Sequence, residues 1–389
     1  MKVVRFDQEE SKYSEIVIYG TTVGGKIVYQ CLEKRGIKVA FFCDRSEKYK
    51  EFCGTPVKKP ETLKDQKGYV VINALTRSFM SACQYLAEIG YDKVYSCSSL
   101  IEDERAENFT VEENEKVLVE DFLEKYLIYA ERENDNEIIL PALEVFITER
   151  CTLRCRDCSH LIPRYVKPID YDINEIIGYL KNVLSVVSKI SDLIILGGEP
   201  LLHKQIDKLL RYCYEEKRIG EITIISNGSV MPEERILQEM KETQTRLRIS
   251  NYGKYSTRLN EIIEQCKLRS IACYVNDELW TDMGDIYIHN YSEEELKEIF
   301  ADCPFAFSLL LLRGRLFRCA HVAHLNSLGV INSAEHDSVD VSIVTNENLE
   351  NKKEEVRRYM QIDFLQGCNY CNGIKNSIQG IEPAIQGIR

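Results

Sequence analysis

The stretch Cys151-Thr-Leu-Arg-Cys155-Arg-Asp-Cys158 places three cysteines within eight residues of one loop. An apolar run at 143–148 precedes it and predicts a buried strand, so the loop follows the carboxyl end of that strand. Three thiols this close in sequence can converge on one metal centre, and thiolates are the ligands that hold iron–sulfur clusters. Four cysteines are the usual complement, and here no fourth lies nearby in the sequence. We therefore expect a cluster with one iron open to a small-molecule ligand.

The residues after this loop predict an alternating series of strands and helices. Strands are expected at 192–196, 221–226, 246–250 and 271–275, and helices at 173–188, 204–217, 233–243 and 256–268. This alternation predicts a parallel β/α sheet. Ligands of such sheets bind at the carboxyl ends of the strands.

Short polar and glycine-rich motifs stand at three of these strand ends. Gly197-Gly198-Glu199-Pro200 ends the second strand, Ser226-Asn227-Gly228 ends the third, and Ser250 ends the fourth. Each motif alone is weak evidence, because Gly-Gly and Asn-Gly pairs often form simple turns. Three motifs in order at successive strand ends are a strong indication of one ligand site.

The cysteine spacing and the strand-end motifs together resemble the signature of the radical S-adenosylmethionine superfamily. The resemblance implies an α/β fold with a partial (β/α)6 barrel and a [4Fe-4S] cluster bound by Cys151, Cys155 and Cys158. It also implies that S-adenosylmethionine chelates the open iron and is cleaved reductively to a 5′-deoxyadenosyl radical, which abstracts hydrogen from a substrate. The residues that it assigns to S-adenosylmethionine are Gly197, Gly198, Glu199, Asn227 and Ser250. The alternative for the three cysteines is a zinc site or unrelated thiols, although zinc loops more often supply four ligands from CxxC pairs.

A second cysteine set lies near the end of the sequence. Cys303 and Cys319 flank a predicted hairpin around Arg313-Gly314-Arg315, and Cys368-Asn-Tyr-Cys371 follows a predicted helix at 347–361. This arrangement resembles the twitch element, a shortened relative of the SPASM domain, and implies one auxiliary [4Fe-4S] cluster. A structural zinc site remains open as the alternative, because four thiolates suit both. We interpret His321 and His324, which follow Cys319, as ordinary packing or solvent residues.

Residues 14–100 predict a separate small α/β unit. A strand at 15–19 leads into Gly20-Thr21-Thr22-Val23-Gly24-Gly25 and a helix, and the next strand ends at Asp44. This opening is typical of a dinucleotide fold, but Thr22 replaces the middle glycine and should crowd a pyrophosphate. With Gly54-Thr55-Pro56-Val57 it also resembles the Rossmann-like domains attached to bacterial sugar-modifying enzymes. Nucleotide binding, a vestigial role and protein docking all stay open, and Asp44 could equally be a solvated strand-end carboxylate.

The pattern divides the chain into four regions. We expect a Rossmann-like domain at 1–100, an acidic helical connector at 101–140, a radical core at 141–300 and a twitch/SPASM-like cap at 301–389. The N-terminal unit favours a small-molecule substrate, a sugar or nucleotide-sugar, that is dehydrogenated, epimerised or dehydrated. A peptide maturase is the alternative enzyme, although we find no winged-helix peptide-recognition element before residue 140. A non-catalytic zinc or iron–sulfur scaffold is the alternative of another class.

If a substrate radical takes back a hydrogen atom, a donor such as a Cys or Tyr must face the site. Tyr252, Tyr274 and Cys273 lie near predicted strand ends, but periodicity does not assign their faces.

Composition narrows the partners and the compartment. The chain has 62 acidic and 50 basic residues, and its net charge of −12 disfavours a nucleic-acid partner. The first residues are too charged for a secretory signal, and the longest near-apolar run, 305–312, is too short to span a membrane. We expect a cytoplasmic protein with no membrane partner, reduced by a flavodoxin or ferredoxin. Fifteen cysteines in a reducing compartment argue for metal or redox use of some of them.

Overall fold

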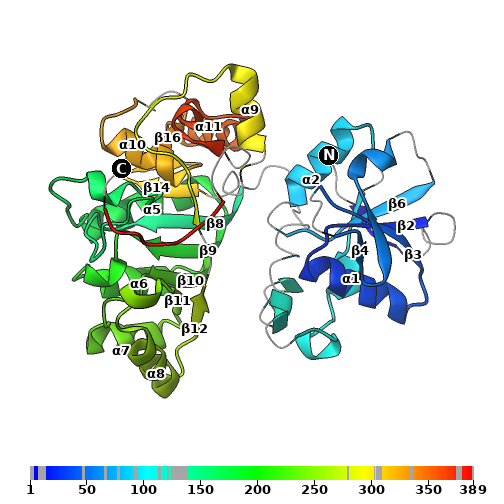
Figure 1. The fold of residues 1–389 in the computed structure, drawn as a ribbon, viewed down its shortest axis with the longest axis horizontal. Coiled ribbons are helices and arrows are strands. Elements are labelled where there is room, and N and C mark those ends of the chain that lie inside the picture. Colours follow the sequence, from blue (N-terminus) through cyan, green and yellow to red (C-terminus); the bar gives the residue numbers. More distant parts are fainter. Residues whose placement is uncertain are drawn as a thin grey trace. The chain divides into compact units, whose positions relative to one another are not determined.

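The computed structural model divides the chain into two compact units, Met1–Glu137 and Ile138–Arg389, which are described separately below (Figure 1). The structure describes residues 4–7, 15–45, 49–64, 68–76, 79–91, 94–112, 115–116, 118–120, 122–123, 126, 138–277, 280–301, 303, 309–332, 336–373 and 379–387.

The first unit is built on a mainly parallel sheet in the order β1-β7-β6-β2-β3-β5-β4. The strands are β1 (Val4–Arg5), β2 (Glu15–Tyr19), β3 (Val39–Cys43), β4 (Glu51–Phe52), β5 (Thr55–Lys58), β6 (Tyr69–Asn73) and β7 (Val94–Ser96). The helices are α1 (Val23–Lys34), α2 (Phe79–Glu88) and α3 (Ser98–Ile101). Only β4 and β5 pair antiparallel within the described sheet. β2, which the sequence predicts as a buried strand, is the central one.

The acid-rich segment that the sequence predicts as a connector contributes to the first unit. Phe109, Val119, Phe122 and Tyr126 are buried in the same apolar core as β2 and β6. The Tyr126 hydroxyl accepts a hydrogen bond from the Cys97 amide at 3.0 Å. The predicted boundary at residue 100 therefore differs from the structural boundary after Glu137, because these aromatic side chains anchor an otherwise polar segment.

The second unit contains five successive parallel strands with helices between them, as the sequence predicts (Figure 1). The strands are β8 (Ile139–Phe146), β9 (Lys189–Leu196), β10 (Ile219–Ser226), β11 (Arg246–Ser250) and β12 (Cys273–Asn276). The helices are α5 (Ile173–Val186), α6 (Ile206–Glu215), α7 (Glu234–Glu242) and α8 (Leu259–Arg269). The Asp172 side chain caps α5 by accepting from the Asn174 amide at 2.7 Å. Parallel pairing brings the carboxyl ends of β8 to β11 to one edge of the sheet.

The sixth parallel strand does not lie where a (β/α)6 series would place it. β14 (Leu309–Leu312) pairs with β8, at the opposite side of the sheet from β12. It continues through the predicted hairpin into β15 (Arg315–Phe317) and then β16 (Ser338–Asp340), both antiparallel. All four residues of β14 are buried, because β8 and β15 flank it. In the described part of the chain the parallel series therefore has five successive strands, and the sixth parallel strand, β14, lies on the far side of β8.

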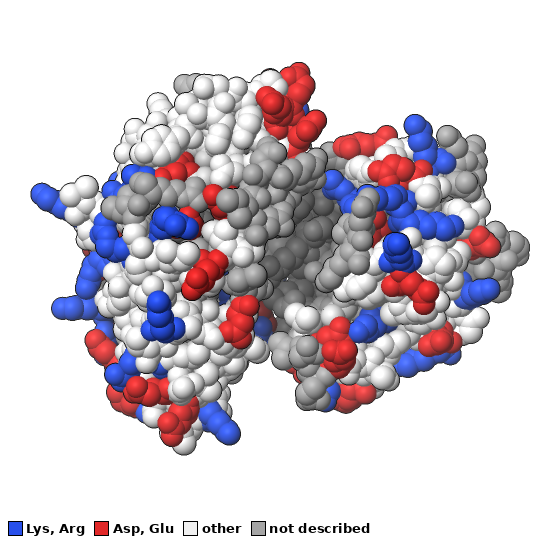
Figure 2. Space-filling view, viewed as in Figure 1, with Lys and Arg blue, Asp and Glu red and all other residues white. Residues whose placement is uncertain are grey.

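The remaining elements surround the second cysteine set. They are α9 (Glu293–Ala301), α10 (Ala320–Ser327), α11 (Leu349–Gln361) and the 3₁₀ helix η8 (Gln366–Tyr370). A small antiparallel pair, β13 (Trp280–Thr281) and β17 (Gln379–Ile381), joins two distant segments. In the described residues, every helix is too short or too polar to cross a membrane. On the face drawn in Figure 2, Lys and Arg side chains are interspersed with Asp and Glu.

Candidate functional site

The three cysteines of the first set lie in the loop that follows β8. Cys155 is buried and Cys151 and Cys158 are half-buried. Burial raises the pKa of Cys151 to about 11 and that of Cys155 to about 12, and the neighbouring cysteine sulfurs contribute to both shifts. The thiols therefore lie near enough to repel one another when ionised. A cationic metal centre is what would keep them as thiolates at neutral pH.

Two glycines directly after β9 allow the end of this strand to pack closely against the cysteine loop. A Cβ atom on Gly198 would lie 2.4 Å from the Arg150 carbonyl oxygen and 2.8 Å from the Cys151 Cβ. One on Gly197 would lie 2.8 Å from the Thr148 carbonyl oxygen. The Gly198 amide in turn donates to that Thr148 oxygen at 2.8 Å. Glycine at these positions is thus required by the close approach of β9 to the cysteine loop.

Glu199 joins the ends of β9 and β10 from a fully buried position. Its Oε2 accepts from the Asn227 amide at 2.8 Å and the Ser226 hydroxyl at 3.1 Å, and its Oε1 accepts from the Leu201 amide at 3.2 Å. Burial raises the pKa of Glu199 to about 7, although these hydrogen bonds oppose the shift. In this arrangement Glu199 fixes the strand-end turn that carries Asn227.

Asn227 reaches back from the end of β10 to the cysteine loop. Its Nδ2 lies 3.5 Å from the Cys151 Sγ and donates to the Thr152 hydroxyl at 3.2 Å. Its Oδ1 accepts from the Ser229 amide at 2.9 Å, which fixes the orientation of the side-chain amide. The structure therefore brings together Cys151, Glu199 and Asn227, which the sequence places at three different strand ends.

Ser250 and Tyr252 complete the strand-end row at β11. Ser250 is half-buried, and its carbonyl oxygen accepts a hydrogen bond from the Ser256 hydroxyl at 3.3 Å. Tyr252 packs edge-on against Trp280, with ring centroids 5.3 Å apart, beside Leu153 and Cys155. Burial raises the pKa of Tyr252, and all three cysteines of the loop add to the shift. Tyr252 thus faces the cysteine loop, whereas Cys273 packs against the main core of the unit.

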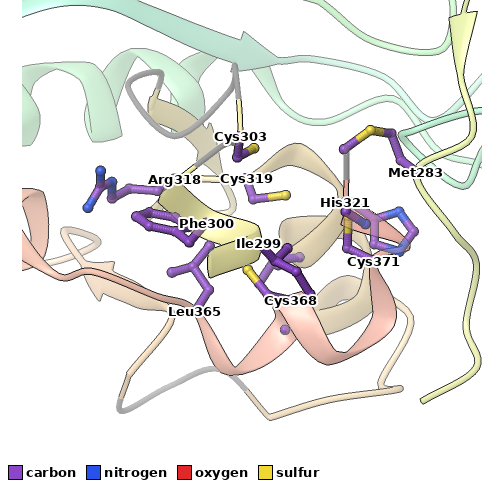
Figure 3. Close-up of a pocket in the computed structure, with 13 residues that line it drawn as sticks. Met283, Ile299, Phe300, Cys303, Arg318, Cys319, His321, Leu365, Cys368 and Cys371 are labelled. Atoms are coloured by element: carbon purple, nitrogen blue, oxygen red, sulfur yellow. The ribbon is translucent and has the colours of Figure 1, made fainter. Parts of the chain in front are cut away.

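The second cysteine set comes from three separate places in the chain. Cys303 follows α9, Cys319 caps the start of α10, and Cys368 and Cys371 lie in and just after η8. All four line one pocket with an empty volume of about 440 Å³, which includes space open to solvent (Figure 3). Burial raises the pKa of Cys368 to about 12 and of Cys371 to about 11. The four thiols thus share one cavity, and four cysteines are the usual donor set of a thiolate-bound centre.

Within the described residues, His, Cys, Asp and Glu side chains form no group of three or more that is compact enough to hold a single metal ion.

Buried histidines pack between the two cysteine-bearing elements. His324 is fully buried, its Nδ1 lies 2.7 Å from the Tyr165 hydroxyl, and its ring lies 5.2 Å from that of His160. Burial lowers the pKa of His160 to about 4 and that of His324 well below its usual value. His321 is also buried, and its Nε2 lies 3.1 Å from the Asp285 carbonyl oxygen. His321 and His324 are thus packing residues and not solvent residues, and sequence reasoning did not single out His160.

In the first unit, protein atoms occupy the space beside the glycine turn that follows β2. A Cβ on Gly24 would lie 2.3 Å from the Phe122 ring and 2.4 Å from the Ala74 carbonyl oxygen. Asp44 is not a solvated carboxylate, because its Oδ2 accepts from the Thr21 amide at 2.7 Å and hydroxyl at 2.6 Å. Packing therefore explains both the glycines and the acid of this motif without a nucleotide.

Comparison with known proteins gives one family match and several looser likenesses. Residues 145–250 match the model of the Radical SAM superfamily. GTP 3',8-cyclase of Clostridium acetobutylicum is 24% identical over 165 residues, which cover 38% of this chain and 50% of that protein. The chain thus spans about half the length of this curated relative.

Two solved structures match this chain with low TM-scores and low sequence identity. BtrN in complex with AdoMet and 2-DOIA has a TM-score of 0.41 and 15% identity, covering 64% of this chain and 98% of that chain. Streptococcus suis SuiB bound to S-adenosylmethionine has a TM-score of 0.31 and 14% identity, covering 72% of this chain and 60% of that chain. The family match spans the cysteine loop and every strand-end motif named above. Residues 145–250 therefore form a radical SAM domain.

Proposed function

We propose that this chain is a radical S-adenosylmethionine enzyme in which Cys151, Cys155 and Cys158 bind a [4Fe-4S] cluster. The observation that carries the proposal is the convergence of the cysteine loop, Glu199 and Asn227 through bonds between adjacent strand ends. When bound, the cluster with S-adenosylmethionine supplies a 5′-deoxyadenosyl radical. The three thiols leave one cluster iron for that cofactor.

The protein's own contribution is to orient ligands and exclude water. Asn227 donates toward the Cys151 sulfur, and Glu199 holds the turn on which Asn227 stands. Tyr252 and Trp280 pack against the loop at Leu153 and Cys155. We assign Gly197, Gly198, Glu199, Asn227 and Ser250 to the S-adenosylmethionine site. Of these, Glu199 acts by positioning, since its carboxylate is fully buried and engaged by the protein.

We assign Cys303, Cys319, Cys368 and Cys371 to a second, auxiliary [4Fe-4S] cluster in a twitch/SPASM-like cap. The shared pocket of these four cysteines supports this assignment. Complete ligation by protein thiolates would make this centre an electron conduit and not a substrate site. A structural zinc ion is the competing occupant, and metal analysis of the purified protein separates the two.

The substrate class that we favour is a sugar or nucleotide-sugar, oxidised, epimerised or dehydrated in the cytoplasm with electrons from a flavodoxin or ferredoxin. The Rossmann-like strand order of the first unit supports a small molecule over a peptide. Epimerisation has one specific support, since Tyr252 faces the cysteine loop and could return a hydrogen atom to a substrate radical.

Anaerobic reconstitution with iron and sulfide tests the proposal. The protein should turn brown, bind S-adenosylmethionine and release 5′-deoxyadenosine when reduced, and Cys155→Ala should abolish that release while the protein stays folded. A colourless, folded zinc protein without this activity would favour a scaffold. The candidate sugar, nucleotide-sugar or peptide that increases 5′-deoxyadenosine release identifies the substrate class.

A further inference from the structure

A segment near residue 386 returns to the cysteine loop of the second unit. β17 pairs antiparallel with β13, with Trp280 opposite Ile381, and the chain then runs on through residues 382–387. Ala384 in this run is fully buried against Leu153 and Cys155. We name residues 382–387 the strap, because they cross the loop that carries the first cysteine set.

Backbone hydrogen bonds fasten the strap to both sides of Cys155. The Arg156 amide donates to the Ile385 carbonyl oxygen at 2.7 Å, and the Gly387 amide donates to the Arg154 carbonyl oxygen at 2.8 Å. Cys155 and Gln386 thereby form an isolated antiparallel bridge. Ala384 adopts a left-handed φ of 58°, a conformation that is unfavourable for a residue with a side chain and persists only where its surroundings enforce it.

The side chain of Gln386 is held with its nitrogen toward the sulfur. Its Oε1 accepts from the Arg154 amide at 2.7 Å, and only the amide oxygen can accept from a backbone N–H. The Nε2 therefore lies on the other side, 2.6 Å from the Ala384 carbonyl oxygen and 3.5 Å from the Cys155 Sγ. The orientation of this amide is fixed by its partners on the strap and the loop.

We propose that Gln386 is a positioning residue that donates an N–H···S bond to Cys155 and raises the reduction potential of the first cluster. The inference rests on the proposed function, because it requires a cluster on Cys155. One electron enters the cluster when it is reduced, and the added charge is shared with the thiolate sulfurs. A donor at a sulfur stabilises the reduced state more than the oxidised one, and hydrogen bonds to sulfurs are among the factors that set such potentials.

The test is a redox titration of the reconstituted full-length protein, followed by electron paramagnetic resonance. Gln386→Met keeps an unbranched side chain of similar length without the N–H donor. Gln386→Glu also removes the donor but keeps an oxygen for the Arg154 amide. We expect the equilibrium constant for reduction of the first cluster to fall roughly tenfold in Gln386→Met, which is about 59 mV for a one-electron couple. Gln386→Glu should lower the potential at least as much, because it adds negative charge.

Two controls separate this inference from the proposed function. The second centre should keep its properties in both variants, and Gln361→Met, at the exposed end of α11, should leave the first potential unchanged. An unchanged potential with a fully loaded first cluster in either variant would overturn the inference and leave the proposed function intact. Loss of the first cluster in both variants would also overturn it, because Gln386 would then hold the loop and not tune the cluster. A wild-type protein that binds no cluster on Cys155 contradicts the proposed function itself.

Discussion

The two cysteine sets of the second unit are assembled in opposite ways. The first set comes from a single loop between β8 and the 3₁₀ turn at Ile162–Arg164, and the rest of the fold contacts it from outside. The second set is drawn from the ends of α9, α10 and η8, which meet only when these elements are folded together. The cysteines of the first site are therefore close in sequence, and neighbouring strand ends and the strap hold their loop in place. The cysteines of the second site instead come from separate elements, so a centre bound there would connect those elements. Loss of a ligand should have different consequences in the two places.

The largest expected effect separates activity from stability. Cys155→Ser should remove 5′-deoxyadenosine release completely yet change the thermal midpoint little, because the loop keeps its backbone bonds to β9 and the strap. Cys319→Ser should lower the thermal midpoint of the reconstituted protein, by about 2–4 °C for each kcal/mol lost, because the energy of binding the proposed second centre is folding energy of the elements that supply its cysteines. Calorimetry and iron analysis under anaerobic conditions measure both.

Cys53→Ser, a half-buried cysteine of the first unit, is the matched control for these two variants and should change neither iron content nor release. Equal destabilisation by Cys155→Ser and Cys319→Ser would contradict the contrast between a local and a linking site.

A smaller effect concerns Glu199, which supports only the first site. Burial raises its pKa to about 7, above the 4.5 of an ordinary Glu, so the folded state holds a proton that the unfolded state has already lost. The stabilising contribution of this group is therefore present below pH 4.5 and is lost as the pH rises through 7. Between pH 5 and 8 the free energy of unfolding of the iron-free protein should fall by about 2–3 kcal/mol more than that of Glu199→Gln.

Urea unfolding of both iron-free proteins across this pH range measures the Glu199 difference, since other titrating groups are common to the two. Parallel stability curves for wild type and Glu199→Gln would show that the three hydrogen bonds to the carboxylate outweigh its burial.

Much of the second unit could be predicted from the sequence. Strands β8 to β10 are largely buried and apolar and end in turn residues, and the helices after them are amphipathic, so local pattern is enough there. Cys151, Cys155 and Cys158 could be assigned together because they are adjacent in the chain. The loop and the strand-end motifs predicted a radical SAM core at 141–300, and the Radical SAM model matches residues 145–250 within it.

The features that could not be predicted depend on contacts between distant residues. Nothing local to Gln386 indicates that it pairs with Cys155, since the bridge between them joins positions far apart in the chain. Leu309–Leu312 could be predicted as a strand, but an apolar run does not specify that it pairs with β8 and not with β12. Phe122 and Tyr126 lie in an acid-rich segment, and only the packed core reveals that they belong to the first unit.

The smallest expected effect tests whether the first site depends on the fit between β9 and its loop. In Gly198→Ala the new methyl group would overlap the backbone carbonyl oxygen of Arg150 and the Cβ atom of Cys151. Neither atom can move by a side-chain rotation alone, so the loop itself must move. We expect a loss of about 1–3 kcal/mol in the free energy of unfolding and reduced iron loading at the first site with full loading at the second. Gly178→Ala is the matched control, because it lies in α5 with nothing within 4 Å of the added Cβ and should stabilise the protein by about 0.5–1 kcal/mol. If Gly198→Ala loaded both sites fully, the neighbours of the first loop would not determine its geometry, and the contrast between the two cysteine sets would reduce to their spacing in the sequence.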